Sequence, residues 1–417
     1  MISKIKNISL YSILVLSVVT SACKKENTGN PQSGGELIKY ENIKNLTLTD
    51  IEVIRTVKLD LFLSTAEIKG PAYISRMAPA KYPVKLYKVT YSSDIPEQNN
   101  KRTTATGLIA IPDVPATSLP VISYQHGTVF YKDWAPSMYE KSFETQFMIS
   151  QFASQGYVVI AADYFGIGDV SPESNSYFVR YSTEQACLDM YKASLKVLEK
   201  ENKTMSRFFI NGWSQGGFNT MLFLRRLERE NIPVKAAFTA AAPVDPVLFI
   251  NRGLHNPRSF DADFTPAALT NLIFSLESYN NISGISQKYI NTKFYEKAKS
   301  LYSFKLDYEE FMKDLPKELN QIFTPDFFKE SKEVNTPFWS VLSNSEAYRW
   351  LSPTPLKVFG GGRDEAVPDY VAKLAYDYMS TLGKKDIESI NAGPQADHRN
   401  TYIESLITAK PWIDSFQ

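Results

Sequence analysis

The sequence predicts an α/β protein with a doubly wound, mostly parallel sheet, and two observations support this fold class. Short apolar runs, typical of strands buried on both faces, lie at 120–124, 157–162, 208–211 and 234–241. Helical stretches separate these runs, at about 137–155, 182–200 and 215–230. Because strands that alternate with helices form right-handed crossovers, we expect helices on both faces of the sheet.

The remaining elements extend this sheet at both ends. Alternating runs at 84–91 and 103–111 flank an Asn-rich turn and predict an antiparallel pair. Residues 246–352 lack strand patterns and are rich in aromatic residues, which predicts a helical cap; these aromatics either cover a site or only pack the cap onto the body. The last expected elements are strands at 356–359 and 387–390 and helices at about 368–382 and 400–416. The α/β body is therefore divided into 46–245 and 353–417.

Composition excludes several classes of function. The 417 residues include 46 Lys and Arg against 45 Asp and Glu, and the net charge of +1 gives no electrostatic basis for binding nucleic acid. Two cysteines and three histidines are too few for a disulfide framework, a Cys-rich zinc module or a multi-His metal site. No metal site is therefore expected.

The N-terminus predicts export across a membrane. Two lysines precede an apolar run at 8–19, which is too short to span a bilayer and has the form of a secretory signal. Small residues then lead to Cys23, which resembles the lipobox of bacterial lipoproteins. We interpret 1–22 as a lipoprotein signal peptide, Cys23 as the lipidated residue and 23–45 as a flexible tether; an ordinary signal peptide is the alternative. The protein is then expected at the cell envelope, on the periplasmic or extracellular face of a membrane, with Cys187 a free thiol.

The strongest chemical signal is Gly-Trp-Ser-Gln-Gly-Gly at 212–217. It follows a predicted strand and opens a predicted helix, which is the context that a nucleophile elbow requires. Gly212 and Gly216 supply the small residues that so tight a turn needs on either side of the serine. We therefore expect Ser214 in a strained backbone, with its hydroxyl above the sheet, as the nucleophile.

A serine hydroxyl needs a base, and in this type of fold an acid and then a histidine follow the nucleophile. His398 directly precedes the last helix and is the expected base, whereas His255 lies at the start of the cap and is expected to be a surface or cap residue. Asp364 follows the strand after the cap and is expected to orient the imidazole. Glu365 and Asp245 are the alternative acids; otherwise they cap helices or lie in solvent.

The oxyanion of an acyl-transfer reaction needs two backbone donors. The amide of Gln215, directly after the nucleophile, is the first expected donor. The second is expected from Tyr-Gln-His-Gly-Thr after the first parallel strand, with Thr128 preferred and Gly127 as the alternative. His126 in this loop is expected to be structural, as is the Asp-Tyr-x-Gly-x-Gly turn that begins at Asp163.

Together these motifs resemble the α/β-hydrolase superfamily. The set comprises Tyr-Gln-His-Gly-Thr, Asp-Tyr-x-Gly-x-Gly, Gly-x-Ser-Gln-Gly-Gly, Gly-x-Arg-Asp-x-x-Val-Pro and Asp-His, over about residues 80–417. It is most similar to the secretory-lipase, or lipase-A-like, branch. The resemblance implies hydrolysis of a small-molecule carboxylic ester, with a helical cap before the catalytic acid. This acyl-transfer chemistry needs no cofactor. A serine peptidase of the same fold and a non-catalytic surface lipoprotein are the alternatives.

Overall fold

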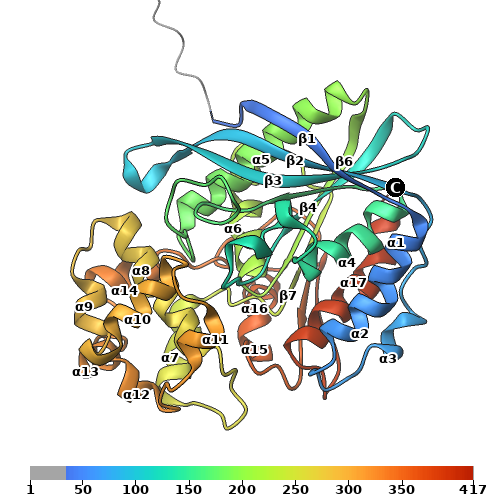
Figure 1. Ribbon diagram of the computed structural model, residues 1–417. Helices are drawn as coiled ribbons and strands as arrows, with labels where there is room; N and C mark the ends of the chain where they lie inside the picture. The colour runs from blue at the N-terminus through green and yellow to red at the C-terminus, as the bar shows by residue number, and fades with distance from the viewer. Residues whose placement is uncertain (1–33, 417) are drawn as a thin grey trace, which may run out of the picture. The chain divides into compact units, whose positions relative to one another are not determined.

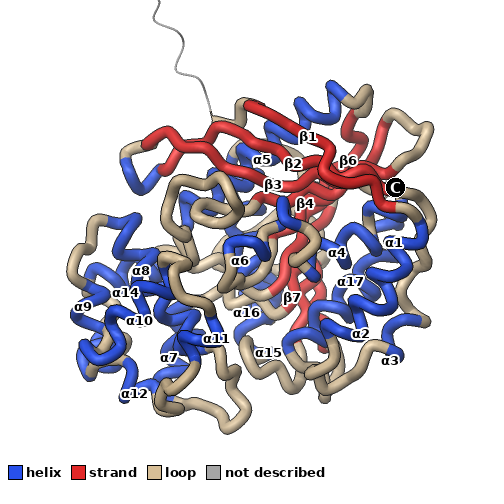
Figure 2. Tube along the Cα trace, in the orientation of Figure 1, coloured by secondary structure: helices blue, strands red, loops and turns tan. Residues whose placement is uncertain are grey.

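The computed structural model describes residues 34–416, so the predicted signal peptide and Cys23 lie outside the described residues. The strands are β1 (Leu37–Leu46), β2 (Val84–Ile95), β3 (Lys101–Pro112), β4 (Ser118–Gln125), β5 (Val158–Ala162), β6 (Thr204–Trp213), β7 (Ala236–Ala240), β8 (Leu356–Gly360) and β9 (Ile387–Asn391). Within the described range they form one sheet in the order β1-β2-β3-β5-β4-β6-β7-β8-β9 (Figures 1 and 2). The pairs from β1 to β5 are antiparallel, and the pairs from β5 to β9 are parallel.

Helices cover both faces of this sheet (Figure 1). One face carries α1 (Leu48–Val53), α2 (Leu59–Phe62), α3 (Pro71–Ile74), α4 (Phe143–Gln151), α15 (Asp369–Ala372) and α17 (His398–Asp414), and the other carries α5 (Arg180–Lys200), α6 (Gln215–Arg229) and α16 (Leu374–Thr381). The five residues of β5 are all buried and alternate between the two cores: Val158, Ile160 and Ala162 face one, Val159 and Ala161 the other. This alternation is the physical basis of the continuous apolar run, and the prediction of a doubly wound sheet is confirmed.

All eight strands predicted from the sequence are present, but one predicted helix is shorter than expected. A helix was expected at about 137–155, but the α-helix of this stretch, α4, begins only at Phe143 and ends at Gln151. The backbone amide of Ser137 donates instead to the carboxylate of Asp163, at 2.8 Å, so the segment before α4 is held by the loop after β5.

The predicted tether over 23–45 is wrong from residue 37 onward, because β1 pairs with β2 along its length. Two bulges interrupt the pairing. A bulge inserts one extra residue into a strand, so the less exposed residues recur at every third position, at Leu37, Tyr40, Ile43 and Leu46. A strand is normally recognised by apolar residues at every second position, so this spacing gave no strand signal in the sequence.

The insertion between β7 and β8 is helical, as expected, and is described without gaps. Its helices are α7 (Pro246–His255), α8 (Thr265–Asn280), α9 (Ile285–Tyr289), α10 (Thr292–Tyr302), α11 (Tyr308–Met312), α12 (Leu319–Ile322), α13 (Pro325–Glu330) and α14 (Pro337–Ser343), drawn in yellow to orange in Figure 1. Several of its aromatics pack on one another: Phe327 lies 5.1 Å from Tyr289 and 5.5 Å from Trp339 between ring centroids. These residues pack within the cap itself, which is neither of the two roles expected for the aromatics from the sequence. Within residues 34–416, no helix is both long enough and apolar enough to cross a bilayer.

The carboxyl ends of the parallel strands define one edge of the sheet. The chain runs from β4 to β5 on one side and then returns to β6 on the other, and in open α/β sheets ligands bind at the edge where the strand order reverses in this way. Strand register sets Gln125 opposite Gly212 and Gly360 opposite Asn391. The loops that follow β4, β6, β8 and β9 therefore meet at this edge, and they carry most of the predicted site residues.

The pairing of β1 predicts how N-terminal truncation affects stability. The reference for this comparison is a protein that begins at residue 34 and keeps the whole of β1. A protein that begins at residue 48 should melt about 5 °C lower or more, because it exposes β2 and loses the packing of Tyr40 on Tyr87. Equal melting temperatures for the two proteins would contradict the role of β1 as a structural strand.

Candidate active site

Ser214 occupies a strained turn between β6 and α6. Its φ of 58° and ψ of −127° lie outside the regions that residues with a side chain usually adopt. The turn is held by the Ser214 amide, which donates to the carbonyl of Ala240 at 2.9 Å. Ser214 remains partly exposed, whereas both of its chain neighbours are buried. These are the features of a nucleophile elbow.

The two glycines of the motif are required by close backbone contacts. A Cβ atom on Gly212 would overlap the carbonyl oxygen of Gly216, and one on Gly216 would overlap the carbonyl oxygen of Gln125. The start of α6 therefore packs directly against the loop that follows β4, with no room for a side chain between them. This contact brings the expected oxyanion loop to the nucleophile.

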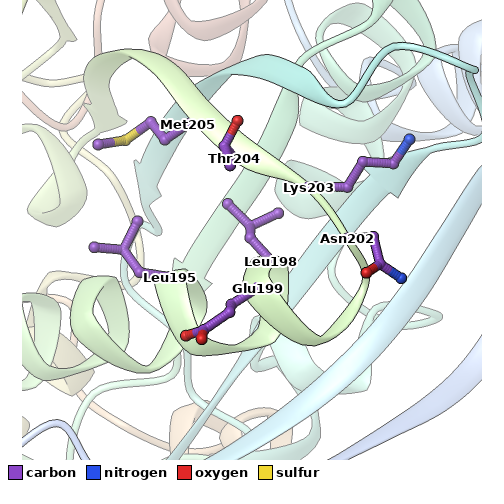
Figure 3. A pocket seen from close by; sticks show the side chains of 7 residues that line it. All are labelled: Leu195, Leu198, Glu199, Asn202, Lys203, Thr204 and Met205. Atoms are coloured by element: carbon purple, nitrogen blue, oxygen red, sulfur yellow. The ribbon is translucent and has the colours of Figure 1, made fainter.

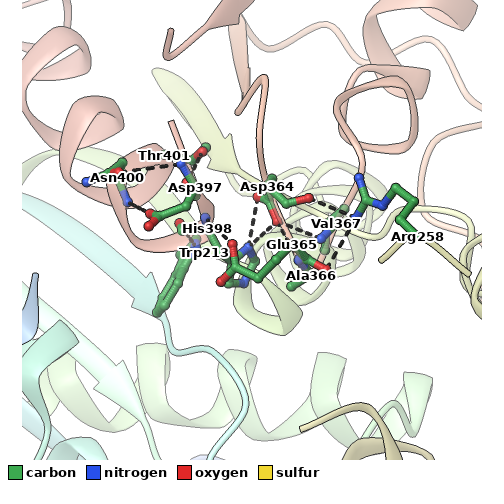
Figure 4. Close-up of polar contacts among 10 residues, drawn as sticks. All are labelled: Trp213, Arg258, Asp364, Glu365, Ala366, Val367, Asp397, His398, Asn400 and Thr401. Atoms are coloured by element: carbon green, nitrogen blue, oxygen red, sulfur yellow. Dashed lines mark hydrogen bonds and ion pairs between the residues drawn. The ribbon is translucent and has the colours of Figure 1, made fainter. Parts of the chain in front are cut away.

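His398 and Asp364 are brought together from different elements (Figure 4). His398 is the first residue of α17, and its Nδ1 atom lies 2.9 Å from both carboxylate oxygens of Asp364. Both side chains are almost fully buried, with residue exposures of 4% and 1%. When Nδ1–H donates to Asp364, the neutral ring keeps Nε2 as the nitrogen that accepts a proton.

The acid is itself held by its own loop. One oxygen of Asp364 accepts hydrogen bonds from the amides of Ala366, at 2.9 Å, and Val367, at 2.7 Å (Figure 4). Burial opposes a positive charge on His398, but the neighbouring carboxylates, chiefly Asp364, outweigh burial and raise the pKa of His398 above its ordinary value. The arrangement favours a proton on the imidazole, as a general base requires.

The alternative residues make other contacts. Glu365 accepts a hydrogen bond from the main-chain amide of His398, at 3.0 Å, so it holds the backbone of the histidine (Figure 4). Asp245 caps α7 by accepting from the amide of Leu248 at 3.0 Å, the structural role foreseen for it. His255 bonds to the hydroxyl of Ser331, at 2.8 Å, inside the cap.

Trp213 links the base to the nucleophile. Its indole nitrogen donates to the carbonyl oxygen of His398 at 3.1 Å, and the two rings lie 4.7 Å apart. It also stacks on Tyr402, one helical turn after His398, at 5.0 Å. The residue before Ser214 thus fixes the start of α17 beside the elbow. No sequence signal marks this tryptophan, since the Gly-x-Ser-x-Gly pattern accepts any residue at its position.

Of the two amides in the loop after β4 that were considered as oxyanion donors, one is already engaged in a hydrogen bond. The Gly127 amide donates to the carboxylate of Glu144 at 2.7 Å, so the prediction of Gly127 as an oxyanion donor is wrong. The amides of Thr128 and Gln215 donate to no group within residues 34–416. These two amides are the candidate oxyanion donors, and the Thr128 hydroxyl is held 3.0 Å from that of Tyr177.

His126 is structural, as predicted. Its Nδ1 lies 2.8 Å from the Gly127 carbonyl oxygen and its Nε2 3.2 Å from that of Asp163, while its ring stacks on Tyr164 at 4.2 Å. Burial lowers the pKa of His126 to about 4, which keeps the ring neutral. The Asp163 carboxylate in turn binds the amide of Ser137, and burial raises the pKa of Asp163 to about 6.

The cap is fastened to the loop that carries the acid. The guanidinium of Arg258, between α7 and α8, donates to the carbonyl oxygens of Asp364, at 2.8 Å, and Glu365, at 3.2 Å (Figure 4). The amide of Ala262 also donates to the Glu365 carbonyl, at 3.0 Å. Arg258 is oriented by Asp261, whose carboxylate accepts from its Nε at 2.7 Å.

A pocket of about 590 Å³ lies elsewhere, at the turn between α5 and β6 (Figure 3). Its lining comprises Leu195, Leu198, Glu199, Asn202, Lys203, Thr204 and Met205. Ser214 follows the opposite end of β6, at a distance of about 30 Å for a strand of this length, so the pocket is separate from the candidate active site. Within the described part of the chain, no three His, Cys, Asp or Glu side chains are grouped to hold a metal ion.

The chain is similar to known hydrolases in sequence profile and in fold. The profile of the prolyl oligopeptidase family matches residues 141–281, about a third of the chain. No curated protein sequence shows significant similarity to it.

Solved structures match almost the whole chain. A Legionella pneumophila protein described as a hydrolase is 21% identical with a TM-score of 0.80, covering 91% of this chain and 98% of its own. The rice cell wall degrading esterase LipA from Xanthomonas oryzae is 19% identical with a TM-score of 0.77, covering 92% and 99%. Candida antarctica lipase A in its closed state is 16% identical with a TM-score of 0.67, covering 92% and 82%. These likenesses confirm the expected α/β-hydrolase fold.

The close contact at Gly216 predicts a selective loss of activity. Gly216→Ala should lower the hydrolytic rate at least about 100-fold, because the added methyl pushes the loop after β4 away from the elbow. Gly253→Ala in α7 is the matched control, since a Cβ atom there meets nothing within 4 Å. Steady-state rates and melting temperatures of both variants test this, and a fully active Gly216→Ala protein would contradict the geometry of the elbow.

Proposed function

We propose that this chain, which has the α/β-hydrolase fold, is a serine hydrolase that cleaves small-molecule carboxylic esters through an acyl-enzyme. The observation that carries the proposal is the buried His398–Asp364 pair, at 2.9 Å, on the sheet edge that also carries the strained turn at Ser214. A strained serine, a polarised imidazole and free backbone donors at one edge are the requirements of acyl transfer.

In the first half of the reaction, Ser214 Oγ attacks the ester carbonyl while Nε2 of His398 takes the hydroxyl proton. The Asp364 carboxylate stabilises the imidazolium, and the amides of Gln215 and Thr128 donate to the negative oxygen of the tetrahedral intermediate. The imidazolium then gives its proton to the alcohol oxygen as the carbon–oxygen bond breaks. An acyl-serine remains and the alcohol leaves.

In the second half, water attacks the acyl-serine and His398 accepts a proton from this water. The tetrahedral intermediate collapses with transfer of that proton to Ser214 Oγ, which releases a carboxylic acid and restores the enzyme. Each proton moves through Nε2, so the tautomer set by Asp364 serves both halves.

Ester cleavage is preferred over peptide cleavage because structures similar along nearly the full chain include an esterase and a lipase by name. The prolyl oligopeptidase match is the observation that favours a serine peptidase instead. Initial rates on p-nitrophenyl esters of increasing acyl length and on aminoacyl p-nitroanilides compare the two. We expect turnover of the esters; turnover of anilides alone would favour the peptidase.

Replacement of the nucleophile gives the most direct test of the mechanism. Ser214→Ala should reduce ester hydrolysis by about 10⁶-fold, leaving the residual rate that the oxyanion donors and substrate binding support, and should abolish labelling by a fluorophosphonate. The melting temperature should stay close to that of the wild type, since Ser214 is partly exposed and only one oxygen atom is removed. Retained labelling of the Ser214→Ala protein would place the nucleophile elsewhere.

The effect of Asp364 on the pKa of His398 predicts how kcat/KM depends on pH. His398 must be neutral to act as a base, and its pKa is raised above the ordinary 6.5, so kcat/KM of the wild type should fall as the pH drops through a value above 6.5. Asp364→Asn removes the charge that raises this pKa. We expect kcat to fall by roughly 10³–10⁴-fold and the acidic limb of the profile to move to lower pH. An unchanged acidic limb would show that another group controls the base.

A further inference from the structure

Glu144 is a carboxylate beside the candidate active site that the mechanism above does not use. It lies in the first turn of α4, and one of its oxygens, Oε2, accepts two hydrogen bonds: from the amide of Gly127, at 2.7 Å, and from the hydroxyl of Tyr124, at 2.5 Å. The residue keeps some exposed surface, but loss of water around its carboxylate raises the pKa of Glu144 to about 7. A carboxylate with a strongly shifted pKa at a site edge is a candidate for a functional role.

The oxyanion loop is held at several of its backbone groups, and Glu144 holds one of them. The peptide group between His126 and Gly127 is held at both ends: its carbonyl accepts from the Tyr164 hydroxyl at 3.2 Å, and its N–H donates to Glu144. The next peptide group is held at its carbonyl by the ring of His126, which leaves the N–H of Thr128 free. Because the peptide group is planar, these contacts fix the direction of the Thr128 N–H.

The Glu144 contact acts together with the His126 contact, because they hold the N–H and the carbonyl of the same glycine, Gly127. Gly127 lacks a Cβ atom and has wide conformational freedom, so the direction of the next amide depends on what holds Gly127 in place. The hydrogen bond to Glu144 fixes the N–H of Gly127.

Glu144 also connects this loop to the base and the elbow. Its main-chain carbonyl accepts from the hydroxyl of Tyr402 at 2.9 Å. Tyr402 lies one turn after His398 on α17 and stacks on Trp213, the residue before the nucleophile, at 5.0 Å. The first turn of α4 is therefore in contact with both the oxyanion loop and the helix that carries the base.

We propose that Glu144 is a positioning residue that aims the Thr128 amide at the oxyanion of the transition state by holding the amide of Gly127. The inference rests on the proposed function, since it concerns the same intermediate. The required feature is an oxygen acceptor at the position of Oε2, because one atom receives both hydrogen bonds. Glutamine can place a carbonyl oxygen there, whereas alanine leaves the Gly127 amide without its partner.

The experiment compares Glu144→Ala with Glu144→Gln on a short p-nitrophenyl ester. Glu97→Ala is the matched control, because Glu97 is also partly buried, accepts two backbone amides, from Tyr181 at 2.9 Å and Ser182 at 3.1 Å, and has a pKa raised by burial. Four readouts are needed: kcat and KM, the inhibition constant of a boronic acid that forms a tetrahedral adduct on serine, the fraction of sites labelled by fluorophosphonate, and the melting temperature.

For Glu144→Ala we expect kcat per labelled site to fall about 10- to 100-fold, less than the loss of a whole oxyanion donor, with KM within threefold of the wild type. The boronic acid should bind more weakly by a similar factor, since it shares the tetrahedral geometry. Glu144→Gln should stay within threefold of the wild type in all these quantities. Glu97→Ala should lower the melting temperature and leave kcat per labelled site unchanged.

Three results would overturn the inference: unchanged kcat per labelled site in Glu144→Ala, a change in KM alone, or a Glu144→Gln protein as impaired as Glu144→Ala. The last result would assign the effect to the charge of Glu144. If the wild type neither hydrolyses the ester nor is labelled at Ser214, the proposed function itself fails, and this outcome is distinct from the other three.

Discussion

The candidate site depends on the close approach of two backbones, at Gly216 in the first turn of α6 and Gln125 at the end of β4. This contact permits no side chain at Gly216 and brings the oxyanion loop to the nucleophile. The backbone strain at Ser214 costs about 1–3 kcal/mol. Burial of α6 offsets it readily, because each fully buried large apolar residue contributes about 1.5–3 kcal/mol. Met221, Leu222, Phe223 and Leu224 are all fully buried on this helix.

A second set of contacts joins the acid, the base and the cap. Asp364 binds the imidazole of His398 while the adjacent Glu365 binds the amide of the same histidine. The carbonyl oxygens of both acidic residues accept from Arg258 of the cap. The loop after β8 is thus fixed from the body on one side and from the cap on the other, so the orientation of the base depends on both parts of the chain.

The sequence was sufficient to predict eight of the nine strands in residues 34–416, the turn at Ser214 and the pairing of His398 with Asp364, because each has a local signature. Buried strands appear as apolar runs, the elbow needs small residues around Ser214, and few histidines compete with His398. The bulged strand β1 was missed because its inward residues recur at every third position. The amide of Gly127 was misassigned because its partner, Glu144, lies 17 residues away in a helix with no recognisable motif. Trp213 and Arg258 also act through contacts that only the folded chain brings together.

The most direct test of the central claim is a crystal structure of the protein after reaction with a fluorophosphonate. We expect phosphorus bound to Ser214 Oγ, with one phosphonyl oxygen about 2.7–3.1 Å from both the Gln215 and the Thr128 amide nitrogens. His398 should remain paired with Asp364, with Nε2 turned to the Ser214 oxygen. A phosphonyl oxygen that contacts neither amide, or an adduct on any other residue, would contradict the claim that this edge of the sheet is the site of acyl transfer.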